Sequence, residues 1–213
     1  FPSVSNPVIC QEVTQDYPTD DFFSLSEGQR PRLGTGRIPA SNINEALSYA
    51  DKLESYLDNS TNGPWKNTIL LVSDDEVKNG SDIDIEVLHT KYSDNIYQLL
   101  SDLTFIKTLY GPMYEPTYNE ESRRLPELTN DIILNLNKGA AIINYIGHGD
   151  PEKWSAEHII EKNRDLNLID IKDNKLPIWI AGTCYFGRYD GVNSMSEALL
   201  FDSNSAISIV GAT

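Results

Sequence analysis

The stretch AAIINYIGHG, residues 140–149, decides the fold class predicted for this chain. Its first seven residues, 140–146, are apolar apart from Asn144 and include β-branched isoleucines, which is typical of a buried strand. The strand then gives way to Gly147, His148 and Gly149, where the glycines let the backbone turn sharply and leave the imidazole open. Polar residues directly after a buried strand lie where parallel sheets place ligands and catalysis, at the carboxyl ends of strands.

Similar apolar runs occur along the rest of the chain and alternate with segments of helical periodicity. Strands are predicted at 68–73, 104–109, 140–146, 177–183 and 206–212, and helices at 42–58, 92–103, 127–137 and 194–201. Gly139 is placed to cap the helix 127–137 at its C-terminal end. Strands separated by helices imply βαβ units, so we expect an α/β fold with a parallel-rich sheet and helices on both faces.

The first 35 residues differ from this pattern, because they are rich in proline, aspartate, serine and glycine and show no sustained period. We expect them to be an irregular lead-in or the tail of a preceding subdomain. Residues 36–213 are expected to form the α/β subdomain. The chain begins at Phe1 and shows no targeting segment, so we expect an excised or processed fragment.

The charge of the chain excludes one class of partner. Asp and Glu total 32 against 17 Lys and Arg, for a formal net charge of −15. Such a surface repels phosphate backbones, so nucleic acid is not an expected partner. Acidic clusters at Asp20-Asp21, at Asp74-Asp75-Glu76 and at Asp82 with Asp84 could hold calcium, or they could be solvated loops. No required cofactor is predicted, and a structural calcium ion is left open.

The cysteine count limits the chemistry further. Only Cys10 and Cys184 are present, alongside His89, His148 and His158, which argues against a disulfide-rich scaffold and against a structural zinc site. A disulfide between Cys10 and Cys184 would remove a nucleophile, so this alternative competes directly with a catalytic interpretation of Cys184.

Three chemically capable segments follow strands of the predicted sheet. Asp74-Asp75-Glu76 follow the strand 68–73, His148 follows the strand 140–146, and Cys184 follows the strand 177–183. Because the carboxyl ends of parallel strands meet at one edge, we expect these residues to lie together. A cysteine beside a distant histidine in such a frame supports nucleophilic catalysis, with Cys184 as the nucleophile and His148 as its base.

The remaining roles in such a centre are assigned more loosely. The N–H groups of Gly149 and Cys184 could form an oxyanion hole. Asp75 is our first choice to orient the imidazole, although the sequence does not separate it from Asp74 and Glu76. Each feature also has a structural alternative: a histidine packed in a loop, an inert cysteine or a solvated acidic turn.

Four segments carry a resemblance to the gingipain-type cysteine peptidases, a branch of the caspase-like fold. They are Gly36-Arg37-Ile38-Pro39, Asn144–Gly149 with Trp154 five residues later, Ile180–Cys184, and Ser196-Glu197-Ala198-Leu199. The resemblance implies that residues 36–213 are a caspase-like catalytic subdomain, expected to be truncated at its C-terminal end. We expect Trp154 and Tyr185 to contribute to the substrate pocket.

Within this family, Val72–Asp75, Leu88–Thr90 with Asp94, and Cys184–Asp190 are most similar to the sortase branch of the type IX secretion system. That resemblance implies an enzyme at the outer-membrane surface of a Bacteroidota-type bacterium, or outside the cell. Its substrates would be proteins with C-terminal sorting domains, and its partners would include a lipopolysaccharide acceptor and other secretion-system proteins. The alternative is a catalytically inactive caspase-like module that binds partners in a secretion complex.

Overall fold

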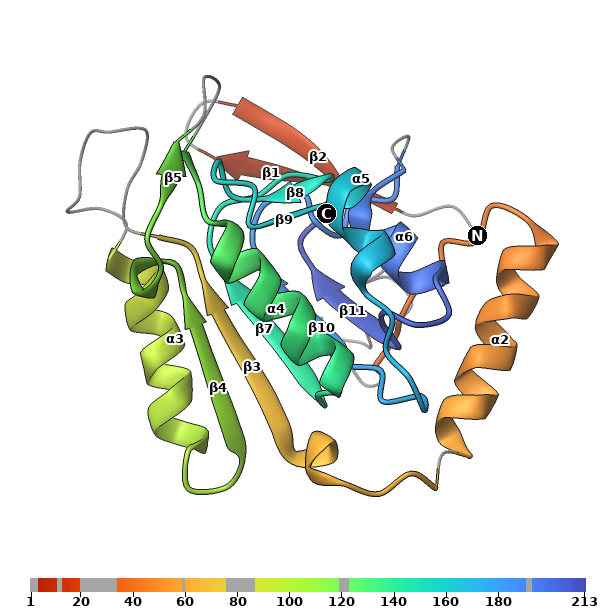
Figure 1. Ribbon diagram of the computed structural model, residues 1–213. Helices are drawn as coiled ribbons and strands as arrows, with labels where there is room; N and C mark the ends of the chain where they lie inside the picture. Colours follow the sequence, from red (N-terminus) through yellow and green to blue (C-terminus); the bar gives the residue numbers. More distant parts are fainter. Residues whose placement is uncertain are drawn as a thin grey trace.

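The computed structural model describes residues 34–58, 60–75, 87–118, 123–190 and 193–213, together with the backbone of residues 4–10 and 13–19. Its centre is a five-stranded sheet in the order β11-β10-β7-β3-β4, in which every neighbouring pair is parallel (Figure 1). The strands are β3 (Thr68–Ser73), β4 (Phe105–Tyr110), β7 (Ile142–Ile146), β10 (Ile178–Gly182) and β11 (Ser208–Gly211). All five predicted strands are therefore confirmed, with ends that differ by no more than two residues.

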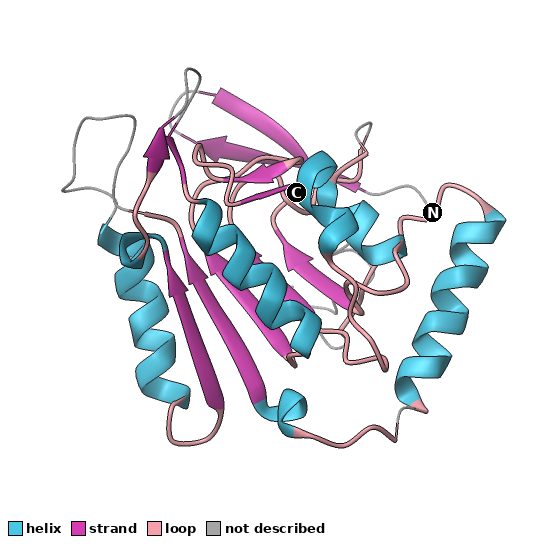
Figure 2. Ribbon diagram, in the orientation of Figure 1, coloured by secondary structure: helices cyan, strands magenta, loops and turns pink. Residues whose placement is uncertain are grey.

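Helices cover both faces of this sheet, as the alternation of strands and helices predicts (Figure 2). They are α2 (Ile43–Leu57), α3 (Val87–Leu100), α4 (Pro126–Lys138), the short α5 (Lys162–Asp165) and α6 (Met195–Phe201). Gly139 adopts a φ of 96° directly after α4, a conformation that glycine reaches at little cost. The predicted helix 92–103 overlaps α3, which begins five residues earlier and ends at Leu100.

The two faces of β3 show how the core is divided. Leu70 and Val72 point into the larger core cluster, which also holds the buried face of α4. Ile69 and Leu71 point the opposite way, into a second cluster to which α3 contributes. The α4 residues in the larger cluster are Leu128, Ile132, Ile133 and Leu136, and the α3 residues against the second are Ile96 and Leu100. A strand buried on both faces explains why residues 68–73 read as continuously apolar rather than alternating.

Helix α6 is fixed at the start by a capping box. The Ser194 side chain accepts a hydrogen bond from the Glu197 N–H, and the Glu197 carboxylate accepts one from the Ser194 N–H. This reciprocal pair satisfies two backbone donors that the first turn would otherwise leave exposed. Its other end is tied to α2, because Lys52 donates to the carbonyl oxygens of Asp202 (2.9 Å) and Ala206 (2.8 Å).

Outside the central sheet, the described residues form three two-stranded antiparallel pairs and three short 3-10 helices, Pro64–Asn67, Gly111–Met113 and Leu166–Leu168. The pairs are β1 (Val4–Cys10) with β2 (Val13–Thr19), β5 (Thr117–Tyr118) with β6 (Arg123–Arg124), and β8 (Lys153–Trp154) with β9 (Ile160–Glu161). The expectation that residues 1–35 are irregular is wrong for β1 and β2. Pro7 and Pro18 lie in these strands, and proline obscures a strand pattern because it donates no ladder hydrogen bond.

No helix in the described ranges combines the length and the apolar character that a membrane crossing requires.

Candidate active site

The register of the sheet places the three predicted site segments at one edge. Ser73 of β3 pairs with Ile146 of β7, and Ile146 pairs with Gly182 of β10. Ser73, Ile146 and Gly182 thus form one row across the sheet. Asp75, His148 and Cys184 each lie two residues after their strand's member of this row. The pairing continues past β7, since the Gly147 N–H donates to the Gly182 carbonyl oxygen at 3.3 Å.

The loop after β7, residues 147–149 (the histidine loop), and the loop after β10, residues 183–187 (the cysteine loop), are in direct contact. A Cβ added at Gly149 would lie 2.6 Å from Oγ1 of Thr183, the residue before Cys184. A side chain at position 149 would force Thr183 to shift, so glycine allows the two loops to approach this closely. Cys184 is a free cysteine with an exposed side chain, so the alternative of a Cys10–Cys184 disulfide is excluded. An exposed thiol on a loop that touches the loop of an imidazole could serve nucleophilic catalysis.

The loop after Cys184 is held at its far end. Tyr185 takes a positive φ of 54°, and the Gly187 N–H donates to the Ala212 carbonyl oxygen beyond β11 at 2.7 Å. Tyr185 is 47% exposed, consistent with a surface role, while Phe186 is fully buried. The loop is thus anchored on both sides of its two exposed side chains, Cys184 and Tyr185.

Arg37, in one of the quoted sequence segments, lies beside the same loop. A cavity of about 520 Å³ is lined by residues 35–39, by Gly187 and Tyr189, and by β11. The Arg37 guanidinium lies over the Tyr189 ring, 5.1 Å from its centroid. The segments Gly36–Pro39 and Cys184–Asp190, which carry the family resemblance separately in the sequence, therefore lie side by side in the fold.

The backbone of His148 is held by three hydrogen bonds. Its N–H donates to Asp74 Oδ2 at 3.1 Å, while its carbonyl oxygen accepts from the Tyr145 hydroxyl at 2.7 Å and from the Ser155 N–H at 2.9 Å. Gly147, just before it, has no space for a side chain: an added Cβ would lie 2.5 Å from the Asp74 Cβ. The His148 side chain itself is exposed.

A second histidine, to which the sequence analysis assigns no role, lies against the His148 imidazole. His89 comes from the first turn of α3, and the two ring centroids are 5.1 Å apart with the ring planes at 90°. The predicted helix begins at residue 92, after His89, so the periodicity gave no reason to place this side chain at the sheet edge.

Asp74 and Asp75 have different contacts, although both are 2% exposed. Asp74 accepts from the backbone of His148, whereas Asp75 forms an ion pair with Arg123 of β6. Arg123 also lies 3.5 Å from a carboxylate oxygen of the buried Glu157. The role of Asp75 in orienting the imidazole stays a prediction, and Glu76 lies outside the described residues.

Burial raises the pKa of Asp74 to about 7, and the N–H of His148 opposes that shift by stabilising the ionised carboxylate. The nearby carboxylate of Glu157 acts in the same direction as burial. Asp74 therefore titrates close to neutral pH directly beneath the histidine loop.

Carboxylate oxygens of Asp74, Asp75 and Glu157 lie within 4.8 Å of one another and could hold a cation. The Arg123 guanidinium already contacts Asp75 and Glu157, so this group has an internal positive partner. The other acidic clusters considered for calcium, Asp20-Asp21 and Asp82 with Asp84, lie outside the described residues.

The prediction that Trp154 contributes to the substrate pocket is wrong. Its side chain is 0% exposed and belongs to the main core cluster. The ring stacks on Tyr145 with a centroid separation of 4.2 Å and an interplanar angle of 5°. Trp154 pairs with Gly149, just beyond β7, in an isolated antiparallel bridge, and its large aromatic side chain fills the core.

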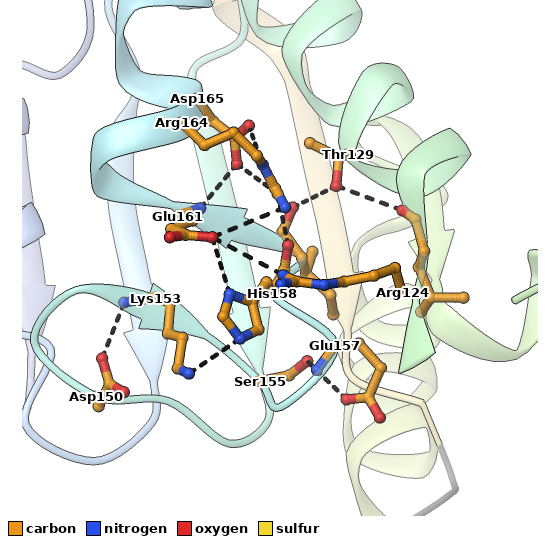
Figure 3. Close-up of polar contacts among 12 residues, drawn as sticks. Arg124, Thr129, Asp150, Lys153, Ser155, Glu157, His158, Glu161, Arg164 and Asp165 are labelled. Carbon is orange, nitrogen blue, oxygen red and sulfur yellow. Dashed lines mark hydrogen bonds and ion pairs between the residues drawn. The ribbon is translucent and has the colours of Figure 1, made fainter. Parts of the chain in front are cut away.

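The turn between β8 and β9 is stabilised by a polar network around His158 (Figure 3). His158 Nδ1 lies 2.8 Å from Glu161 Oε2, and Nε2 lies 3.0 Å from Lys153 Nζ. The Arg164 guanidinium donates to the His158 carbonyl oxygen at 2.6 Å and to Asp165. His158 thus has a structural role in shaping the turn that follows His148.

Comparison with known proteins gives one family match. The model of peptidase family C25 matches residues 2–213 of the chain. A curated relative, an uncharacterized protein of Archaeoglobus fulgidus, is 23% identical over 217 residues, which cover 93% of this chain and 51% of the relative.

Two solved structures share the fold. The crystal structure of the Arg-specific cysteine proteinase gingipain R (RgpB) matches with a TM-score of 0.67 and 19% identity, over 95% of this chain and 44% of that one. A complex of Porphyromonas gingivalis RgpB pro- and mature domains matches with a TM-score of 0.65 and 21% identity, over 92% and 44%. The chain thus spans about half the length of the proteins it matches.

Proposed function

Because the chain belongs to peptidase family C25, we propose that it carries the catalytic centre of a cysteine peptidase, with Cys184 as nucleophile and His148 as base. We assign this centre to a caspase-like subdomain formed by residues 36–213. The observation that carries the proposal is the pairing of Ile146 with Gly182 on neighbouring strands. His148 and Cys184 each follow their member of this pair by two residues. The contact between Gly149 and Thr183 holds their loops together.

The proposed reaction begins when His148 takes the Cys184 thiol proton. The thiolate attacks the carbonyl carbon of the scissile peptide bond and forms a C–S bond. The N–H groups of Gly149 and Cys184 donate to the oxyanion, each contributing on the order of 3 kcal/mol to stabilisation of the transition state. The C–N bond then breaks, and His148 returns the proton to the leaving amine, which leaves an acyl-enzyme.

A second nucleophile completes the cycle. Water would give hydrolysis, whereas an amine would give transpeptidation; in both cases His148 accepts the proton of the attacking group and the thiol is restored. Asp75 would orient the imidazole, and Asp74 would hold the backbone that carries it.

The test measures the reactivity of Cys184 in the protein with iodoacetamide near neutral pH. Cys184 should be alkylated faster than Cys10, and His148→Ala should abolish the difference, because the base is what raises the thiolate fraction. His158→Ala is the matched control, since His158 serves the β8–β9 turn. Slow and equal labelling of both cysteines, unchanged in His148→Ala, would overturn the proposal and favour the inactive module that binds partners.

We further propose that the enzyme is a sortase of the PorU type in a type IX secretion system, acting at the outer-membrane surface. The support is the similarity of Val72–Asp75, Leu88–Thr90 and Cys184–Asp190 to that branch. It would remove C-terminal sorting domains from cargo and transfer the cargo to an amine of lipopolysaccharide, alongside other secretion-system proteins.

Mass spectrometry of a cargo protein with a C-terminal sorting domain tests this step. With lipopolysaccharide present, the cleaved cargo should carry the acceptor in an amide bond. Cargo that ends in a free carboxylate at every acceptor concentration would contradict the sortase assignment while leaving the peptidase assignment intact.

A further inference from the structure

The His148 side chain has an orientation that its own backbone does not determine. Three hydrogen bonds fix the main chain of His148, and its side chain is exposed at the edge of the sheet, where the rotamer about its two side-chain bonds sets the direction of the imidazole. The His89 ring meets it edge to face at 5.1 Å. We propose that His89 is a positioning residue, whose ring selects the His148 rotamer that serves Cys184. This inference rests on the proposed function.

His89 is well suited to be the fixed partner of this pair. It lies in the first turn of α3, and the next residue, Thr90, has its hydroxyl 3.4 Å from that of Ser73 at the end of β3. Farther along, α3 packs on the sheet through Ile96 and Leu100. His89 is partly buried and its Nδ1 is inaccessible to solvent, whereas His148 is exposed. The more buried ring therefore positions the more exposed one.

The geometry favours a ring at position 89 rather than a hydrogen-bonding group alone. Aromatic rings attract edge to face because the edge is electropositive and the face electronegative. Such a contact lowers the number of His148 rotamers that compete with the productive one, and general-base catalysis depends on that geometry. A side chain that keeps the ring should therefore preserve the function of His89, and one that keeps only the volume should not.

The experiment compares three variants of the protein: His89→Ala, His89→Phe and His89→Leu. The rate of Cys184 alkylation by iodoacetamide should fall about 3- to 10-fold in His89→Ala and in His89→Leu, as loss of an edge-to-face contact implies. It should stay within about twofold of wild type in His89→Phe. Tyr92→Ala, at an exposed position of the same helix, is the matched control and should leave the rate unchanged.

A spectroscopic measurement separates positioning from a general effect on folding. The NMR shifts of the His148 ring protons should move in His89→Leu, because the ring current of His89 is lost, while His89→Phe should retain a ring-current shift. Wild-type alkylation rates in His89→Leu, or a loss in His89→Phe equal to that in His89→Leu, would overturn the inference. If His148→Ala leaves alkylation unchanged, the proposed function fails, whereas the His148 ring shifts still report on the pairing with His89.

Discussion

The carboxyl ends of β3 and β10 lie at the same edge of one sheet, but their residues are placed in opposite ways. At the end of β3, Asp74 and Asp75 are each 2% exposed and are held by a backbone N–H and by Arg123. At the end of β10, Cys184 and Tyr185 are exposed. We infer that the two strand ends have different roles: the β3 end holds the histidine loop in place, and the β10 end presents the reactive group.

The largest effect that would test these roles is expected at the β10 end. Cys184→Ala should lower turnover of a peptide library by about 10⁴-fold, because the nucleophile is lost. The free energy of unfolding, measured with urea, should change by less than about 1 kcal/mol, because the side chain is exposed. Cys10→Ala should retain activity. Turnover that survives in Cys184→Ala would show that the β10 end does not supply the nucleophile.

The next largest effect is expected at the β3 end, and on stability. Arg123→Ala would leave the buried Asp75 carboxylate without its ion-pair partner, which should lower the free energy of unfolding by about 3 kcal/mol. The double variant Arg123→Ala with Asp75→Ala should recover part of that loss, since the Asp75 charge is then removed and only Glu157 loses its contact with Arg123. If the free energy of unfolding falls by less than about 1 kcal/mol in the single variant, the ion pair between Arg123 and Asp75 does not stabilise the β3 end.

A smaller effect at the β3 end depends on pH. The pKa of Asp74 is raised to about 7 in the folded protein, so the folded state keeps a proton that the unfolded state releases near pH 4. Stability should therefore fall as pH rises from about 5 to 7, by about 2 kcal/mol from this group, and change little from it above that range. Urea unfolding at both pH values should show a smaller change in Asp74→Asn. An equal change in the variant would assign the dependence to other groups.

The smallest effect on stability is expected at Tyr185. Tyr185→Gly removes an exposed side chain from a position with a φ of 54°, so relief of strain and the added freedom of the unfolded chain should nearly cancel, within about 1 kcal/mol. If Tyr185 contacts the substrate, kcat/KM should nevertheless fall several-fold. Unchanged kcat/KM would remove Tyr185 from the predicted substrate pocket.

The parts of the fold that sequence could predict are those governed by periodicity. The apolar runs located all five parallel strands, and the rule that strands end at one edge brought His148 and Cys184 together. Gly139 was identified as a helix cap for the same local reason, because few residues tolerate its backbone conformation.

The interactions that sequence missed join segments far apart in the chain. Nothing near Asp75 indicates that Arg123, in a two-residue strand, will neutralise it. The family resemblance implied a pocket role for Trp154, but whether an aromatic ring in a short strand faces solvent or core depends on how that strand packs. His89 was missed because its turn of α3 precedes the apolar stripe that made the rest of the helix visible.

The row Ser73–Ile146–Gly182 has a consequence for how related chains can diverge. Because the positions of Asp75, His148 and Cys184 are counted from this row, insertions in the crossovers between strands would lengthen the chain without moving the site. One residue inserted inside β7 or β10 would instead exchange inward and outward side chains beyond it. Relatives of very different length should therefore keep a constant count from strand to reactive residue, even where the intervening segments no longer align.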